Sequence, residues 1–342
     1  MNLKRFYALF HARNQEFIRD KSALGWNIIF PVVIVFGFYF AFSSGPIDLY
    51  KVGSYPSTTI VNKQYGDFFN MNHIKFIPVT NLEEAIAKIE RHQLDMLFDH
   101  AQKQYWINSE SPTAYFLEKL YLGSLVTTQD AQDSYNKQIQ DGTKIRYVDW
   151  LVPGVMAMNM MFSALFGVGY VIVRYRKNGV LKRLKATPLT AFEFLSAQVC
   201  SRLLLVMVIT CIIYAGINYF IQFRMIGSYF DLLFVFALGS FSLISMGLIV
   251  SARIANEEFA SGLLNILSWP MMFLSGVWFS LEGVHPYLQK LAMIFPLTHL
   301  ISGTRAIMID GASLADISTH IITLAVMAIL FLVIGAISFR WD

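Results

Sequence analysis

RYRKNGVLKRLKATPL, residues 174–189, is a basic stretch that lies between two long apolar segments. It holds six Lys and Arg residues and no acidic residue. A short cationic loop between two apolar segments is what the positive-inside rule expects on the cytoplasmic face of a membrane. This stretch therefore fixes the expected orientation of the whole chain.

The same stretch has the spacing of a short amphipathic helix. Val180, Leu181 and Leu184 fall at i, i+1 and i+4, and basic residues alternate with them, so the helix would lie along the membrane surface. Pro188 would end it. Two interpretations follow from this pattern: a solvated basic loop that only sets topology, or a docking helix for a soluble partner.

The composition indicates a membrane protein. Of the 342 residues, 55% are hydrophobic and 15% are charged, which is more apolar and less charged than ordinary soluble domains. The net charge of +4 is small, and no nucleic-acid-binding pattern is present, so no nucleic acid partner is expected. Cys200 and Cys211 share one apolar segment, which suggests neither a disulfide framework nor a metal site.

Six apolar segments are long enough to cross a bilayer. They are Leu24–Phe42, Leu151–Val173, Leu203–Ile221, Tyr229–Ala252, Phe259–Leu281 and Ile317–Phe339. Residues 1–22 read as an amphipathic cytoplasmic helix, and an even number of spans returns the C-terminus to the cytoplasm. The block between the first two spans then lies outside the cytoplasm.

This block, residues 43–149, has a soluble character, with 10 Lys and Arg against 13 Asp and Glu. Short strands are predicted at Thr58–Val61, Lys75–Val79, Leu94–Phe98 and Gln104–Ile107. Asn81 and Glu84 have the spacing of a capping box at the start of a helix. A second helix is predicted from Thr113 to about Ile139. We therefore expect an inserted extracytoplasmic α/β domain.

Residues 282–308 do not read as a simple span. Prolines, a lysine, a histidine and Arg305 interrupt two apolar stretches, and burying such charges in a bilayer is costly. A re-entrant or interfacial helix pair packed against protein is expected instead. The polar residues His285 and His299, with Glu282 and Arg305, would either anchor this pair at the interface or meet a substrate.

No catalytic motif is recognisable in the sequence. It has no phosphate-binding loop, no nucleophile elbow and no His-Glu-x-x-His metal pair. His73, His92 and His100 have no ligand spacing, so neither a metal site nor a cofactor is expected in this chain.

Small polar residues recur at helical spacing in two of the spans. One stripe consists of Ser261, Asn265, Ser268 and Met272, and the other contains Asn159, Ser163 and Gly167. Such stripes serve either as helix-packing seams or as the walls of a path. Both interpretations turn these faces away from lipid.

At this point the motifs resemble a known family. GVLKRLKATPL, residues 179–189, is similar to the GTLxRLxxTPL motif of ABC type-2 permeases, the membrane subunits of ATP-driven exporters. WPMMFLSGVWFSLE, residues 269–282, followed by FPLTH at 295–299 and by Arg305, resembles the family's PxxFLSGxxFPxE, PLT and downstream Arg. Here Ser280 stands where Pro is usual, and His299 replaces a common Tyr. The family's acidic residue before the first Gly is absent.

The resemblance implies a permease that pairs with a second copy, identical or related, and with two separate ATPase subunits that hold ATP and Mg. The charge and apolar pattern, with which the resemblance agrees, predicts four regions along the chain: a cytoplasmic helix at 1–22, a first transmembrane helix at 23–43, an extracytoplasmic domain at 44–149 and a transmembrane domain at 150–342. The last region includes a coupling loop at 174–190 and the re-entrant segment at 282–308. The expected location is a bacterial inner membrane, with both termini cytoplasmic.

The candidate residues fall into three sets. The ATPase-coupling set is Arg13, Arg19, Asp20, Gly179, Leu181, Arg183, Leu184, Thr187 and Pro188. The path set is Asn159, Ser163, Ser261, Asn265, Ser268 and Met272. The re-entrant set is Glu282, Pro296, Thr298, His299 and Arg305. The rival classes are a polytopic membrane sensor and a membrane enzyme, each with an extracytoplasmic ligand-binding domain.

Overall fold

Two units make up the computed structural model, which describes residues 2–42, 50–56, 67–71, 73–90, 94–109, 111–125, 146–281 and 284–341. One unit comprises Met1–Phe42 with Lys144–Asp342, and the other is Ser43–Thr143. Both the predicted strand at Thr58–Val61 and Glu282 lie outside the described residues.

The helical unit begins with α1 (Leu3–Arg19) and α2 (Lys21–Phe42). Asn2 caps α1 by accepting the backbone N–H of Lys4. Asp20 lies between the two helices, and its Oδ1 accepts the backbone N–H of Ala23 at 3.0 Å. One aspartate thus ends the amphipathic helix and starts the apolar one.

The other long helices follow from extended apolar runs. The second predicted span is α5 (Tyr147–Ala164), the π-helical segment η4 (Leu165–Tyr170) and α6 (Val171–Lys177), which together run from residue 147 to 177. The remaining elements are α7 (Val180–Lys185), α8 (Ala191–Ile221), α9 (Tyr229–Ser251), α10 (Glu257–Leu274) and α13 (Ser318–Ser338).

Five helices in the described ranges are long and apolar enough to cross a membrane: residues 21–42, 147–177, 191–221, 229–251 and 318–338. They correspond to five of the six predicted spans. The chain is therefore a polytopic helical membrane protein.

The predicted boundaries of two spans were wrong. The third span does not begin at Leu203, because α8 starts at Ala191, where Thr190 and Glu193 form a capping box. The fifth does not continue to Leu281. Its helix, α10, ends at Leu274, because a turn follows in which Gly276 adopts a φ of +77°.

The re-entrant segment forms a bent pair of helices. The α11 helix (Pro286–Ala292) is followed by α12 (Pro296–Arg305) and the π segment η5 (Ala306–Asp310), and the two arms meet at 94°. Proline is the first residue of both α11 and α12, a position where its missing N–H costs nothing. The sharp bend agrees with the predicted helix pair.

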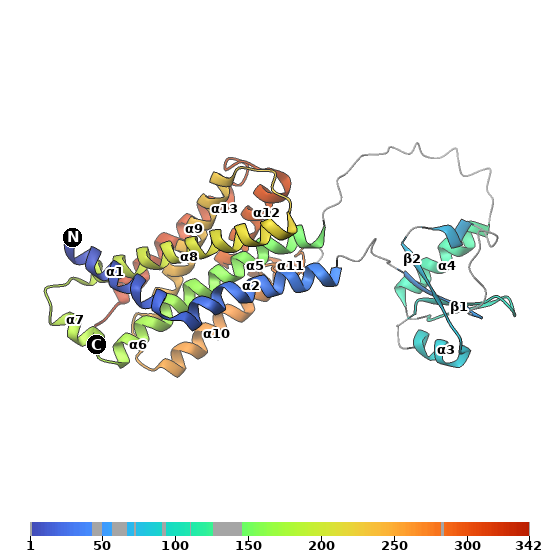
Figure 1. The fold of residues 1–342 in the computed structure, drawn as a ribbon, viewed down its shortest axis with the longest axis horizontal. Coiled ribbons are helices and arrows are strands. Elements are labelled where there is room, and N and C mark those ends of the chain that lie inside the picture. The colour runs from blue at the N-terminus through green and yellow to red at the C-terminus, as the bar shows by residue number, and fades with distance from the viewer. Residues whose placement is uncertain are drawn as a thin grey trace. The chain divides into compact units, whose positions relative to one another are not determined.

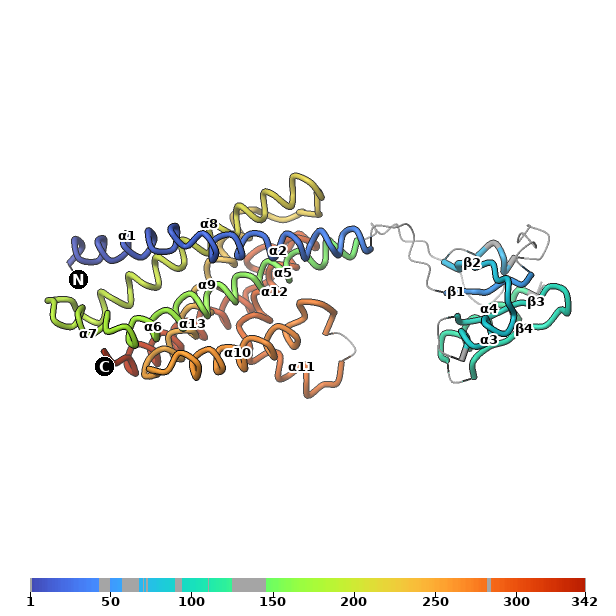
Figure 2. The backbone as a smooth tube through the Cα atoms, turned by 60° about the horizontal axis from the view of Figure 1, so that its bottom comes forward, coloured from blue at the N-terminus to red at the C-terminus, as the bar shows by residue number. Residues whose placement is uncertain are grey.

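Figure 1 shows α1, α7 and both ends of the chain at the same end of the helical unit. In Figure 2 the same elements again lie together. Along the bundle α13 packs on α9, and α2 packs on α5. The basic stretch and both termini therefore share one end of the helical unit.

The second unit contains a four-stranded sheet in the order β2-β1-β3-β4. Strand β1 (Tyr50–Tyr55) pairs in parallel with β2 (Ile74–Pro78) and β3 (Met96–Asp99), and β4 (Gln104–Ile107) pairs antiparallel with β3. The predicted strand Gln104–Ile107 coincides with β4, and the strands predicted near β2 and β3 are confirmed with shifts of one or two residues.

Each face of this sheet has its own apolar cluster. Helix α3 (Leu82–Glu90) contributes Ala85 and Ile89 to one, and α4 (Pro112–Leu125) contributes Leu117 to the other, beside the short helix η2 (Asp67–Asn70). Asn81 caps α3 as predicted, by accepting the backbone N–H groups of Glu83 and Glu84. The predicted continuation of the second helix beyond residue 125 lies outside the described residues.

Candidate functional site

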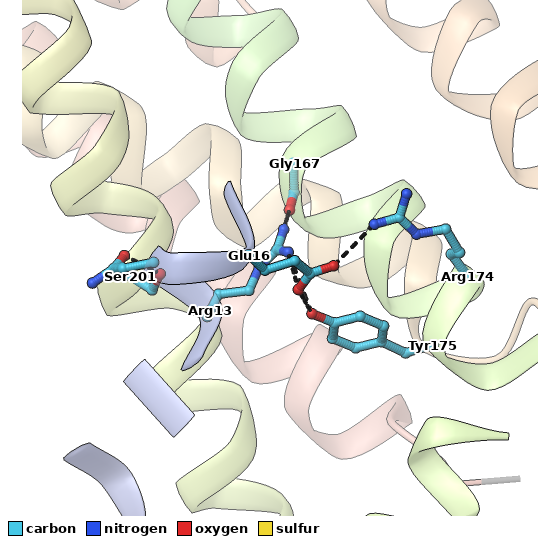
Figure 3. Close-up of polar contacts among 7 residues, drawn as sticks. Arg13, Glu16, Gly167, Arg174, Tyr175 and Ser201 are labelled. Carbon is cyan, nitrogen blue, oxygen red and sulfur yellow. Dashed lines mark hydrogen bonds and ion pairs between the residues drawn. The ribbon is translucent and has the colours of Figure 1, made fainter. Parts of the chain in front are cut away.

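A charged cluster attaches α1 to the helical bundle (Figure 3). Arg13, whose exposed fraction is 6%, donates to the Gly167 carbonyl at 2.9 Å and to Glu16 Oε2 at 2.8 Å. Glu16 also pairs with Arg174 Nη2 at 3.0 Å and accepts a hydrogen bond from the Tyr175 hydroxyl. Burial raises the pKa of Glu16, but these hydrogen bonds and arginine charges lower it by more, so the net pKa lies below its usual value.

The partners of this cluster lie in the π segment η4 and in α6, which follows it. The buried Arg202 of α8 approaches the same region from another direction: its Nε donates to the Ser163 carbonyl at 2.6 Å, and its Nη2 donates to Ser163 Oγ at 2.7 Å. A Cβ added at Gly167 would lie 1.9 Å from Arg202 Nε, so only glycine leaves room for the guanidinium. Arginines from α1 and α8 thus meet at one distorted turn, a kind of feature often found at functional sites.

A groove of about 890 Å³ runs along this turn. Residues of α2, α5, η4, α6 and α10 line it, together with Arg13, Glu16, Phe17 and Asp20 near the end of α1 and with Arg202 of α8. Its volume falls in the range typical of small-molecule sites. Its wall is mostly apolar and includes nine aromatic residues, and its charged side chains come from α1, α6 and α8 and from Asp20 between α1 and α2.

Four of the six predicted path residues line this groove: Asn159, Ser163, Asn265 and Met272. The two predicted stripes therefore meet in one cavity. Asn265 donates its amide to the Ser261 carbonyl one turn back, at 2.9 Å. Ser268 is fully buried, and neither Ser261 nor Ser268 is among the residues that line the groove.

The predicted coupling residues of the basic stretch lie on and around α7. Gly179 begins this helix with a φ of +70°, a conformation that favours glycine. Leu181 is completely buried and Leu184 is half-buried, so the leucines face the bundle. Arg183 is exposed, and Thr187 donates its hydroxyl to the Leu184 carbonyl at 2.6 Å.

The remaining coupling candidates connect this end to α1. Arg5 donates to the carbonyl of Pro188, and the Asn2 backbone N–H donates to Glu193 Oε1 at 2.6 Å. Arg13 and Asp20 line the groove, whereas Arg19 is exposed. The first helix thus touches both the end of the basic stretch and the groove.

The described residues of the re-entrant set make contacts within the protein. Thr298 donates to the Ala292 carbonyl at 2.6 Å, and Arg305 donates to the Trp150 carbonyl at 3.2 Å. The Nδ1 atoms of His299 and His320 lie 3.0 Å apart in a hydrogen bond. Pro296 is buried at the start of α12. None of these residues lines the groove, so their contacts indicate a packing role.

Three residues of this region were missed as functional candidates. Glu16 supplies the acidic partner of Arg174 from another helix, which sequence spacing does not reveal. Arg202 was placed outside the third span, although the Thr190-x-x-Glu193 capping box signals the true helix start. Arg176 is buried and donates to four carbonyls, including Ser251 at 2.9 Å.

Comparison with known proteins places the chain in a family. The family model described as "ABC-2 family transporter protein" matches residues 21–337. The chain belongs to the ABC-2 transporter family. The resemblance deduced from residues 179–189 and 269–299 is thereby confirmed.

Several ABC-2 relatives are similar to parts or all of the chain. It is 28% identical over 211 residues to "Inner membrane transport permease YhhJ" of Escherichia coli, covering 58% of this chain and 55% of that protein. It is 22% identical over 376 residues to "Probable multidrug ABC transporter permease YbhS" of the same species, covering 99% and 95%. It is 26% identical over 205 residues to "Nodulation protein J" of Sinorhizobium fredii, covering 57% and 75%. The chain spans about half the length of YhhJ.

Proposed function

We propose that this chain is the membrane permease subunit of an ATP-binding cassette exporter. The observation that carries the proposal is the groove, which in an ABC-2 family member brings together Asn159 and Ser163 of one span with Asn265 and Met272 of another. A cavity of this size walled by two polar stripes suits a transport path better than a packing seam, because a seam would be filled by close helix contact. Hydrolysis of ATP with Mg is assigned to separate ATPase subunits.

The proposed topology has six spans, with α10 crossing the membrane and the bent pair re-entering from outside. At about 1.5 Å per residue, the 18 residues of α10 reach about 27 Å, close to the thickness of a bilayer core. Both termini and the basic stretch would be cytoplasmic, and residues 44–149 would lie outside a bacterial inner membrane. The shared end of α1, α7 and the chain termini supports this orientation.

The groove would be closed by a second permease copy, identical or related, because its long aromatic wall lies open along α2 and α10. Trp26 and Trp269, one from each helix, have exposed fractions of 68% and 51%. Large exposed aromatics beside polar groove residues fit an interface between protomers or lipid contact.

Coupling to the ATPase would pass through α7. Its exposed Lys182, Arg183 and Lys185 form a basic face, and its buried Leu181 fixes it to the bundle. A displacement of α7 by the ATPase would reach α1 through the hydrogen bond between Arg5 and the Pro188 carbonyl. From α1 it would reach the groove through the hydrogen bond between Arg13 and the Gly167 carbonyl.

The test is reconstitution with a candidate ATPase, with ATPase stimulation as the measurement. Arg183→Glu changes only an exposed side chain, so it should abolish stimulation while the permease still inserts, and Arg183→Lys should retain it. Leu184→Asp should also abolish stimulation, because it loosens α7 from the bundle. Full stimulation of Arg183→Glu would refute docking through this face, and failure of any ATPase to co-purify would refute the exporter proposal itself.

A further inference from the structure

Arg202 is the most deeply buried cation of the groove wall. Its side chain is 4% exposed, and its guanidinium carbon lies 5.2 Å from the centre of the Phe17 ring. Its hydrogen bonds go to the carbonyl and the hydroxyl of Ser163, which are neutral groups. The charge is therefore held by dipoles and by an aromatic face.

Among the described residues, no carboxylate forms an ion pair with Arg202. The two acidic side chains of the groove have other partners: Glu16 binds Arg13 and Arg174, and Asp20 accepts the backbone N–H of Ala23. Three arginines and two carboxylates line the groove, which leaves one positive charge in excess. A buried cation without a counter-charge is unfavourable, and an anion entering the groove would relieve that cost.

The rest of the groove favours the apolar part of a ligand. Aromatic rings from α2, α5, η4 and α10 form its wall, among them Trp26, Phe30, Phe162, Phe166, Trp269 and Phe273. The charged groups are contributed by α1, α6, α8 and Asp20, so the groove combines a cationic region with a long apolar one. This distribution matches a molecule with an anionic head and an apolar body.

We propose that the groove binds anionic amphiphiles, with the head group on Arg202 and the apolar body along the aromatic wall. The substrate class rests on the proposed function, since it takes the groove as the transport path. The head group is a phosphate or a carboxylate, because both accept charge-assisted hydrogen bonds from a guanidinium. It belongs either to a membrane lipid or to a free amphiphile.

The experiment uses the full chain, purified without an ATPase in a neutral detergent. Trp26, Trp269 and Trp278 line the groove, and the chain has six tryptophans, so a brominated acyl chain bound there quenches the protein fluorescence. The probes are brominated lysophosphatidic acid and brominated lysophosphatidylcholine with the same acyl chain. We expect saturable quenching at a concentration about tenfold lower for the anionic probe, weakened by high salt.

The variants separate the head-group contact from a structural role. Arg202→Gln should weaken binding of the anionic probe by about tenfold or more while leaving the zwitterionic probe unchanged, and Arg202→Lys should recover part of the difference. Arg253→Gln is the matched control, because it removes an exposed arginine outside the groove and should change nothing.

Two further arms complete the test. In the first arm, brominated phosphatidylglycerol in phosphatidylcholine nanodiscs replaces the added probe. Saturable quenching in the nanodiscs identifies a bilayer lipid as the source of the anionic head group. Quenching by the added probe but not in the nanodiscs identifies a free amphiphile as that source. Equal affinity for both head groups, or salt-independent affinity in the unmodified protein, would overturn the proposal even where Arg202→Gln fails to fold. Because no ATPase is present, this result is independent of whether the exporter proposal survives.

Discussion

Replacing Gly167 with alanine is expected to destabilise the helical unit, because the new Cβ would lie 1.9 Å from Nε and 2.0 Å from the central carbon of the Arg202 guanidinium. The guanidinium must move, and it then loses its hydrogen bonds to the carbonyl and the hydroxyl of Ser163. Each charged hydrogen bond contributes about 1.5–3 kcal/mol. Alanine regains about 1 kcal/mol of helix propensity. The expected net loss is therefore about 2–5 kcal/mol.

The assay is thermal unfolding of the purified protein in detergent, followed by tryptophan fluorescence. Gly167→Ala should lower the melting temperature by several degrees. Gly37→Ala is the matched control, since within the described residues no heavy atom beyond its own helix backbone lies within 4 Å of the added Cβ, and it should be neutral or slightly stabilising.

A double-mutant cycle tests the assigned cause. In an Arg202→Ala background the guanidinium is gone, so Gly167→Ala should cost little there, and the coupling between the two sites should account for most of the single-variant effect. A Gly167→Ala protein as stable as Gly37→Ala, or one destabilised equally in both backgrounds, would refute the packing of Arg202 against the π segment.

The remaining predictions concern acid stability, transport and topology. The pKa of Glu16 is lowered on folding, so its ion pairs stabilise the protein above the unfolded pKa of about 4.5 and are lost as the pH falls through the folded value. The melting temperature should fall over this pH window by more in the unmodified protein than in Glu16→Gln. An equal fall of the melting temperature in both proteins would contradict this. Asn159→Phe and Asn265→Leu should reduce export in reconstituted vesicles while assembly with the ATPase stays normal, and failure of both to assemble would make the two asparagines structural. Protease added to intact spheroplasts should cut within residues 44–149 before any other loop, and cleavage there only after lysis would reverse the proposed orientation.

Much of the helical unit could be predicted, because hydropathy and helix caps are local signals. Tyr229–Ala252 was placed to within one residue, and Leu24–Phe42 has the correct end but starts three residues late, since long uncharged runs leave few alternatives. The third span was predicted to start at Leu203, whereas α8 starts at Ala191. Arg202 is tolerated inside α8 through Ser163 and the ring of Phe17, which lie on other helices.

The second unit shows the same limit of sequence-based prediction. Strand β1 was missed because Lys51, Gly53 and Ser54 weaken a strand pattern, yet β1 lies at the centre of the sheet. Gly53 is suited to this place because the Leu97 side chain lies 2.7 Å from where its Cβ would be. Two asparagines of the path set were found from helical spacing alone, but the charged wall of their groove depends on contacts between helices, which spacing does not encode.

The π segment at residues 165–170 also sets the angular phase of everything that follows it in the same helix. Each residue of an α-helix advances the side-chain direction by about 100°. Winding these same residues as regular α-helix would turn Arg174, Tyr175 and Arg176 away from Glu16 and from the carbonyl of Ser251. The wider winding of this segment therefore decides whether the helix entering the basic loop faces its partners on α1 and α9.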